Sequence, residues 1–169
     1  GSGAEPRRQC QDHLGVDLAG HDALLFLAGE LPLLRLLFRS NDAEHAILQA
    51  YLKPGQQIVV PGDVYGGKYR MLHKVFEPIG CVIKQVDFAD LDAVSAAISP
   101  ETRLVWLESP TNPRLLVYDI AEISRRAHAA GALVVVDYTF ATPFFQRPFE
   151  LGADLIIHSV TKYLSGHSD

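Results

Sequence analysis

Two hydroxyls and a lysine stand close together near the end of the sequence, at Ser159, Thr161 and Lys162. A lysine amine that reaches its neutral state condenses with an aldehyde, which makes it a natural attachment point for a carbonyl compound. Ser159 and Thr161 are two residues apart, so within a turn both hydroxyls can point at one anion such as a phosphate. These residues predict a site for a phosphorylated aldehyde that is held through Lys162.

Further candidates follow other apolar runs of the chain. Asp137 comes directly after Leu133–Val136, and a carboxylate at a buried strand end needs a cationic partner. A protonated pyridine nitrogen is such a partner, and the pair makes the ring a stronger electron sink. Tyr65 can stack on a flat ring, Asn112 can hydrogen-bond a phenolic oxygen, and Thr139 adds a hydroxyl beside Asp137. Together these residues predict pyridoxal 5′-phosphate as the cofactor.

Each candidate also has a plainer interpretation when it is taken alone. A loop lysine such as Lys162 is usually solvated, and Asp137 could simply cap the next turn. Tyr65 could belong to the core or the surface, and Asn112 between prolines could form an Asx turn. The hypothesis rests on the joint arrangement of these residues on successive strand ends.

The elements that position these residues follow from five short apolar runs with helical patterns between them. The runs are Gln57–Val60, Cys81–Val86, Leu104–Leu107, Leu133–Val136 and Leu155–Ile157. Such runs are typical of strands buried on both faces. Their alternation with helices predicts an α/β fold with a mostly parallel sheet and helices on both faces. Ligands of such sheets bind at the carboxyl ends of the strands, where the candidate residues stand.

The helical patterns have recognisable ends. Lys68–Glu77 has apolar residues on one side, and Asp90 and Asp119 are expected to cap two further helices. Gly131 is the expected C-terminal stop of the helix that follows Asp119.

The first 55 residues are expected to form a helical segment of the same large domain. Asp22–Leu37 has a helix-forming composition, although Pro32 should break or start a helix there. Asp42–Leu52 is predicted to be a separate helix. Residues 56–169 are then the cofactor-binding α/β domain.

Composition excludes several classes of function. The chain has 169 residues, one domain's worth, and a net charge of −5, which argues against a nucleic-acid or anionic-membrane surface. The apolar stretch Ala23–Phe38 is interrupted and too short to span a membrane. Cys10 and Cys81 are far apart, and no metal-ligand spacing is present, so we expect a reduced, cytoplasmic compartment and no metal.

Four stretches of the chain resemble the pyridoxal-phosphate-dependent enzymes of cysteine and methionine metabolism. The stretches are residues 64–70, 108–113, 136–143 and 159–169, and the likeness covers about two thirds of the chain. This family, of fold-type I, includes cystathionine γ-synthase, cystathionine β- and γ-lyases and methionine γ-lyase. The resemblance implies an incomplete large domain of that fold, without the smaller C-terminal domain.

The resemblance also implies roles for the candidate residues. Lys162 would form the internal aldimine, and Tyr65 would stack on the ring and assist proton transfer. The remaining cofactor contacts would be Asp137 to the ring nitrogen, Asn112 to the ring oxygen, Ser159 and Thr161 to the phosphate, and a backbone N–H of Gly29 to the phosphate.

The chain departs from the family at several points. Ala28, Gly29 and Glu30 stand where the family has Ser-Gly-Met, and Tyr138 replaces the usual asparagine. The family's Tyr-x-Arg segment is not recognisable, and the sequence ends abruptly after its last motif. We therefore expect the sequence to be part of a larger polypeptide, or to lack segments.

The predicted function is a lyase that cleaves a C–S bond of a small sulfur-containing amino acid by β- or γ-elimination through an aldimine on Lys162. One alternative is a cystathionine synthase-like transferase that replaces the leaving group. Another is a degenerate, non-catalytic homologue that serves as a scaffold. A nucleotide-binding domain ranks low because its glycine-rich motifs are missing. By resemblance, the protein is expected to form a homodimer or homotetramer.

Overall fold

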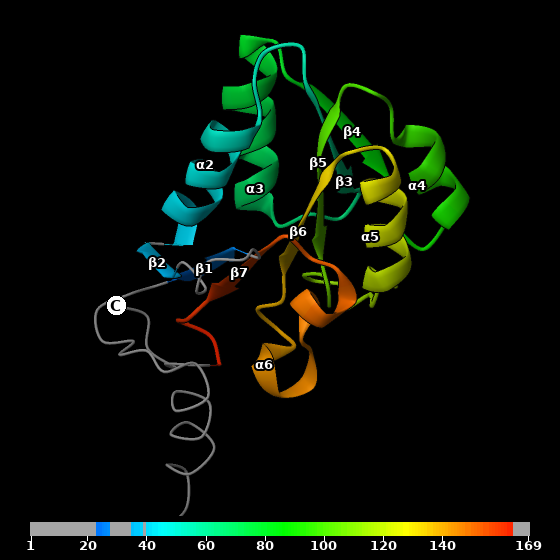
Figure 1. The fold of residues 1–169 in the computed structure, drawn as a ribbon. Coiled ribbons are helices and arrows are strands. Elements are labelled where there is room, and N and C mark those ends of the chain that lie inside the picture. Colours follow the sequence, from blue (N-terminus) through cyan, green and yellow to red (C-terminus); the bar gives the residue numbers. More distant parts are fainter. Residues whose placement is uncertain (1–22, 28–34, 39, 164–169) are drawn as a thin grey trace, which may run out of the picture.

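The computed structural model of the protein describes residues 23–27, 35–38 and 40–163 (Figure 1). Gly29 and Glu30 lie outside the described residues, as does the end of the last motif from residue 164 on. Within the described ranges, no helix combines the length and the apolar character that crossing a membrane requires.

The fold is built on one seven-stranded sheet with the strand order β2-β1-β7-β6-β5-β3-β4. The strands are β1 (Ala23–Leu27), β2 (Arg35–Phe38), β3 (Gln57–Pro61), β4 (Val82–Val86), β5 (Thr102–Glu108), β6 (Leu133–Asp137) and β7 (Leu155–Ser159). Neighbouring strands from β7 to β4 run parallel, whereas β1 pairs antiparallel with both β7 and β2. The predicted α/β fold with a mostly parallel sheet is confirmed.

The helical interpretation of Asp22–Leu37 is wrong for the part that the structure describes. Residues 23–27 and 35–38 form β1 and β2, which pair with each other in antiparallel register. The backbone of β1 also pairs along the whole of β7, with Leu25 opposite Ile157. The free edge of β7 offers a ladder of backbone hydrogen bonds, and this long-range partner outweighs a weak local preference for helix.

The helices lie between the strands, largely as expected. They are α2 (Ser40–Tyr51), α3 (Gly66–Met71), the π-helix η1 (Leu72–Phe76), the 3-10 turn η2 (Glu77–Ile79), α4 (Leu91–Ala97), α5 (Ile120–Ala129), α6 (Thr142–Phe145) and the 3-10 turn η3 (Pro148–Leu151). The helix predicted over Lys68–Glu77 thus begins two residues earlier and changes its winding after Met71.

Both predicted aspartate caps are confirmed. The Asp90 carboxylate accepts hydrogen bonds from the backbone N–H groups of Asp92 and Ala93, each at 3.0 Å. Asp119 accepts one from the N–H of Glu122 at 3.0 Å. Gly131 follows the end of α5 with a φ of +77°, a left-handed conformation that glycine adopts without a steric penalty.

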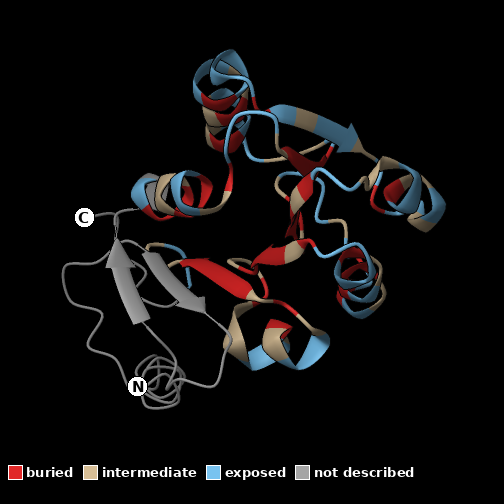
Figure 2. Ribbon diagram, turned by 45° about the horizontal axis from the view of Figure 1, so that its top comes forward, coloured by how far each residue is buried: buried red, intermediate tan, exposed pale blue. Residues whose placement is uncertain are grey.

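Helices cover both faces of the sheet, and the core divides accordingly into two layers (Figure 2). Under α4 and α5 lie Val59, Val105, Leu107, Val134, Val136 and Ile156. Under α2 and η1 lie Ile58, Val60, Leu104, Trp106, Val135, Leu155 and Ile157. Neighbouring residues along each strand thus alternate between the two layers, as the pleat of a sheet requires.

One strand departs from the expectation that the apolar runs are buried on both faces. β4 is the edge strand of the sheet, and Val82, Lys84 and Gln85 are exposed. The polar residues in this run suit an edge, because charged side chains on an edge strand discourage pairing with another chain.

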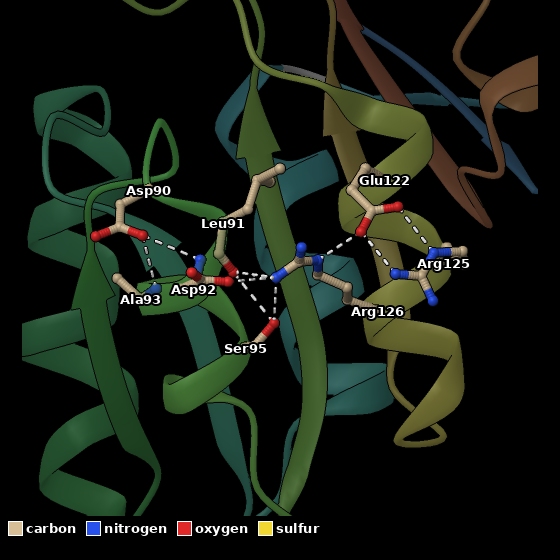
Figure 3. A network of polar contacts seen from close by, with 8 residues as sticks. All are labelled: Asp90, Leu91, Asp92, Ala93, Ser95, Glu122, Arg125 and Arg126. Carbon is tan, nitrogen blue, oxygen red and sulfur yellow. Dashed lines mark hydrogen bonds and ion pairs between the residues drawn. The ribbon is translucent and has the colours of Figure 1, made fainter.

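A polar network ties α4 to α5 on the outer side of their layer (Figure 3). The Arg126 guanidinium donates to the Leu91 carbonyl and the Ser95 hydroxyl, both at 2.6 Å. It also donates to Glu122 at 2.7 Å, one turn earlier on α5. This single side chain therefore holds the two helices at a fixed distance, and α5 in turn packs on the strands that lead to the candidate site.

Candidate functional site

The carboxyl ends of β3, β5, β6 and β7 meet along one edge of the sheet. Between β3 and β5 the chain changes direction across the sheet, because β4 lies on one side of β3 and β5 on the other. Such a switch point is the usual ligand crevice of an open parallel sheet. The described residues that were predicted to bind the cofactor lie at these four strand ends or shortly after them.

Asp137 is the last residue of β6, directly opposite Glu108 at the end of β5. Its Oδ1 atom accepts hydrogen bonds from the backbone N–H of Thr139 at 3.1 Å and from the Thr139 hydroxyl at 2.6 Å. The same hydroxyl oxygen accepts a hydrogen bond from the N–H of Ser159 at 2.9 Å. Thr139 thus orients the Asp137 carboxylate and ties the end of β6 to the end of β7.

The predicted hydroxyl pair is close together in the structure. Ser159 Oγ and Thr161 Oγ1 are 3.0 Å apart, at the end of β7 and in the turn that follows. Lys162 is exposed in this turn, where its backbone N–H donates to the Ser159 carbonyl at 3.4 Å. Two hydroxyls and an accessible amine therefore share one turn, beside the strand that carries Asp137.

Tyr65 and Asn112 follow β3 and β5. The N–H of Tyr65 donates to Glu108 Oε2 at 3.3 Å, and 47% of the residue's surface is exposed. A Cβ atom added at Gly67 would come within 2.5 Å of Tyr65 Cε1, so a side chain there would displace the Tyr65 ring. Asn112 is half-buried in the loop after β5, and in the described part of the chain no hydrogen bond joins it to the other predicted residues.

The structure adds a buried charge cluster that the sequence analysis missed. Lys68 lies in the first turn of α3, and 1% of its side chain is exposed. Its Nζ atom is 3.4 Å from Glu44 Oε1, 3.7 Å from Asp137 Oδ2 and 3.8 Å from Glu108 Oε2. The ammonium also lies 4.9 Å from the centre of a Trp106 ring, a cation–π distance. One cation thus faces three carboxylates at this edge of the sheet.

Burial and charge act against each other in this cluster. Burial alone would lower the pKa of Lys68, but the attraction of Glu44, Asp137 and Glu108 outweighs it and raises the pKa above its ordinary value. Burial raises the pKa of Glu108 to about 7, against the opposing attraction of Lys68. Burial likewise raises the pKa of Glu44. The side chains therefore hold more negative charge than Lys68 neutralises, and they favour a further proton or cation.

Local signals for these residues do exist in the sequence. Glu108 follows its apolar run directly, and by strand alternation it continues the layer of Leu104 and Trp106. Lys68 comes three residues after Tyr65, in the first turn of α3, and its side chain is buried. Glu44 carried no such signal, because only the packing of α2 on the sheet brings it here.

A buried histidine lies beside Asp137 and Ser159. His158 is fully buried in β7. Neither ring nitrogen has a hydrogen-bond partner within the described residues. The ring instead packs edge-on against Tyr138, with 4.9 Å between centroids, and burial lowers its pKa to about 4. His158 is therefore buried as a neutral ring that packs against Tyr138.

The donor set suits pyridoxal 5′-phosphate. The oriented carboxylate of Asp137 can pair with a protonated ring nitrogen. The surplus negative charge around it favours such a cation in addition to Lys68. Ser159 and Thr161 offer hydroxyls to a phosphate, and Lys162 offers an amine to the aldehyde. In the described residues, no three His, Cys, Asp or Glu side chains are arranged to hold a metal ion.

Comparison with known proteins points the same way. The profile of the family described as Cys/Met metabolism PLP-dependent enzymes matches residues 35–169. The chain is similar to chloroplastic cystathionine β-lyase of Arabidopsis thaliana, with 51% identity over 78% of this chain and 28% of the relative. It is 50% identical to cystathionine γ-synthase of Mycobacterium bovis, over 75% of this chain and 33% of the relative. For L-methionine γ-lyase of Pseudomonas putida the identity is 47%, over 72% of this chain and 31% of the relative.

A solved structure shares the fold. Cystathionine γ-lyase from Lactobacillus plantarum, determined in complex with L-serine, superposes with a TM-score of 0.74 and 39% identity. The superposition covers 87% of this chain and 35% of that one. The chain therefore spans about a third of the length of the relatives it matches.

Proposed function

Because the chain belongs to the pyridoxal-phosphate-dependent enzymes of cysteine and methionine metabolism, we propose that it supplies the cofactor-binding part of a lyase that cleaves a C–S bond in a sulfur-containing amino acid. The observation that carries this proposal is the Asp137 carboxylate, oriented by Thr139 beside the hydroxyl pair of Ser159 and Thr161. One strand end thus presents an anion for the ring nitrogen, while its neighbour presents donors for the phosphate.

Each predicted residue has one task in this proposal. Asp137 keeps a proton on the ring nitrogen, and Ser159 and Thr161 bind the phosphate. Tyr65 stacks on the ring, and the half-buried Asn112 donates to the ring oxygen. A backbone N–H of Gly29, which lies outside the described residues, would complete the phosphate contacts.

Lys162 is the better of the two nearby lysines for the aldehyde. Lys68 is held protonated by three carboxylates, so its nitrogen has no lone pair for a carbonyl carbon. Lys162 is exposed in the turn after β7, and among the described residues no such cluster surrounds it. When bound, the cofactor withdraws electrons from the substrate's Cα. Once the substrate's amine has displaced it from the aldehyde carbon, the Lys162 amine would take the Cα proton, and the electron pair of the breaking C–S bond would leave with the sulfur.

Chemical trapping tests this assignment. The chain is incubated with pyridoxal phosphate, reduced with borohydride and digested, and the modified lysine is located by mass spectrometry. We expect the label on Lys162 and its loss in Lys162→Ala, with Lys74→Ala, an exposed lysine on η1, as the matched control. A label spread over surface lysines, or unaffected by Lys162→Ala, would contradict the proposal.

Replacement of the leaving group by another nucleophile is the second candidate function. The 50% identity with a cystathionine γ-synthase favours it, and the residues described above serve both reactions equally. Product analysis with and without an added thiol separates them: elimination yields a keto acid and ammonia, whereas replacement yields a new thioether. A scaffold without catalysis predicts that the chain takes up no cofactor in the trapping experiment.

Three expectations stay predictions within this proposal. They are a homodimeric or homotetrameric assembly, a cytoplasmic location, and a large domain whose cofactor-binding α/β part begins at residue 56 and which a smaller C-terminal domain complements. Light scattering of the purified chain with its cofactor would test the assembly.

A further inference from the structure

Lys68 has an unusual place for a charged residue. Its ammonium is buried at the carboxyl edge of the sheet, and none of its three carboxylate neighbours comes closer than 3.4 Å. Within the described residues, Nζ has no hydrogen-bond partner. The ammonium is therefore held mainly by charge, because no short hydrogen bond fixes it to one of the three carboxylates.

The two oxygens of Asp137 face different partners. Oδ1 is engaged by the N–H and the hydroxyl of Thr139, whereas Oδ2 lies 3.7 Å from Lys68 Nζ. Oδ2 is therefore the oxygen that remains for a cationic partner, and in the described part of the chain Lys68 is the cation paired with it. The ring nitrogen of the cofactor would approach the same carboxylate.

We propose, resting on the function proposed above, that Lys68 is a positioning residue: a built-in cation that competes with the protonated ring nitrogen of the cofactor for the Asp137 carboxylate. Two cations that share one carboxylate repel each other, so Lys68 weakens the hold of Asp137 on the nitrogen proton. The chain thereby sets the electron-withdrawing strength of its own cofactor through a residue that does not touch the reacting atoms.

The rest of the cluster makes this sharing tolerable. With all groups ionised, the three carboxylates and one ammonium carry two surplus negative charges. Glu44 and Glu108 lie 3.4 and 3.8 Å from Lys68 Nζ and can retain the ammonium when the ring nitrogen takes up Oδ2 of Asp137. Lys68 therefore yields part of its contact with Asp137 without being left as an uncompensated buried charge.

The test compares two probes that differ in one atom. The first is pyridoxal phosphate, and the second is its analogue with a C–H group in place of the ring nitrogen. Equilibrium dialysis gives the affinity of each, and the ratio of the two affinities measures the contribution of the nitrogen. A merely structural role of Lys68 would change both affinities together and leave their ratio unchanged.

Four variants of the full chain are compared with the wild type. In Lys68→Met the ratio should rise about tenfold or more, because a neighbouring charge of this kind moves a protonation equilibrium by one unit or more. The double variant Lys68→Met/Glu44→Gln keeps the net charge of the cluster, so it should fold where the single variant fails, and it should show the same rise. Asp137→Asn should bring the ratio close to one, and Lys74→Met should leave it at the wild-type value.

A measurement on the wild type needs no variant that must fold. The nitrogen NMR signal of the Lys68 ammonium should shift when pyridoxal phosphate binds and stay in place when the carbon analogue binds. Equal shifts with both probes, or an unchanged ratio in the double variant, would overturn the inference while leaving the proposed function intact. A wild-type chain that binds neither probe would overturn the proposed function, and the inference with it.

Discussion

His158 should make the protein sensitive to acid, because it is buried as a neutral ring. Its pKa is lowered from 6.5 to about 4 by burial, only partly opposed by the charge of Asp137. A group whose pKa is depressed on folding binds more protons in the unfolded state, so its contribution to stability is lost as the pH falls from about 6.5 through about 4. From these two values, the linkage relation gives a loss of about 2 kcal/mol between pH 7 and pH 5.

The substitution His158→Phe removes this titration and keeps a flat ring beside Tyr138. The assay is urea unfolding at the two pH values, followed by the fluorescence of Trp106, the chain's one tryptophan, which is fully buried. The quantity of interest is the difference between wild type and variant. Glu108 acts in the opposite direction over the same pH range, and that contribution cancels in the difference.

We expect wild type to lose about 2 kcal/mol more than His158→Phe when the pH falls from 7 to 5. Tyr138→Phe is the matched control, because it keeps His158 and its edge-on ring contact and should retain the wild-type loss. Parallel pH profiles for wild type and His158→Phe would refute the reasoning, since they would mean that His158 is not buried as a neutral group.

Three further predictions concern the charge cluster and the helix contacts. Glu108→Gln should stabilise the chain increasingly as the pH rises from about 4.5 through about 7, by up to about 3 kcal/mol. The reason is that folding raises the pKa of the Glu108 carboxyl and so disfavours its ionisation. A variant that gains no stability at high pH in urea unfolding would contradict the raised pKa. Arg126→Met should lower the free energy of unfolding by about 1 kcal/mol, because the methionine keeps the apolar stem and loses the donors that join α5 to α4. An unchanged urea midpoint would show that the network in Figure 3 contributes no net stability. Asp90→Ala should lower the free energy of unfolding by about 1 kcal/mol, because two cap hydrogen bonds at the start of α4 are lost. Asp90→Asn should keep most of that stability. Equal losses in both variants would argue against capping.

The sequence by itself determined the parallel part of the fold and the place of the site. Strands and helices of a βαβ chain reveal themselves through local periodicity, and the caps Asp90 and Asp119 mark helix starts through local hydrogen bonds. Because parallel strands share one carboxyl edge, the residues after each strand were predicted to converge. The proximity of Asp137, Thr139 and Ser159 follows from that rule alone.

The tertiary structure alone decided which charges meet. Glu44, Lys68, Glu108 and Asp137 come from four different elements, and their contacts depend on how α2 and α3 pack over the ends of β5 and β6. The hydrophobic pattern of a single helix does not predict which residues lie opposite its inward face. The same holds for residues 23–27, where a strand forms because β7 provides the partner. Long-range pairing and buried charge are properties of neighbours in space, so a sequence predicts the edge at which the candidate cofactor residues gather but not the cation that already lies among them.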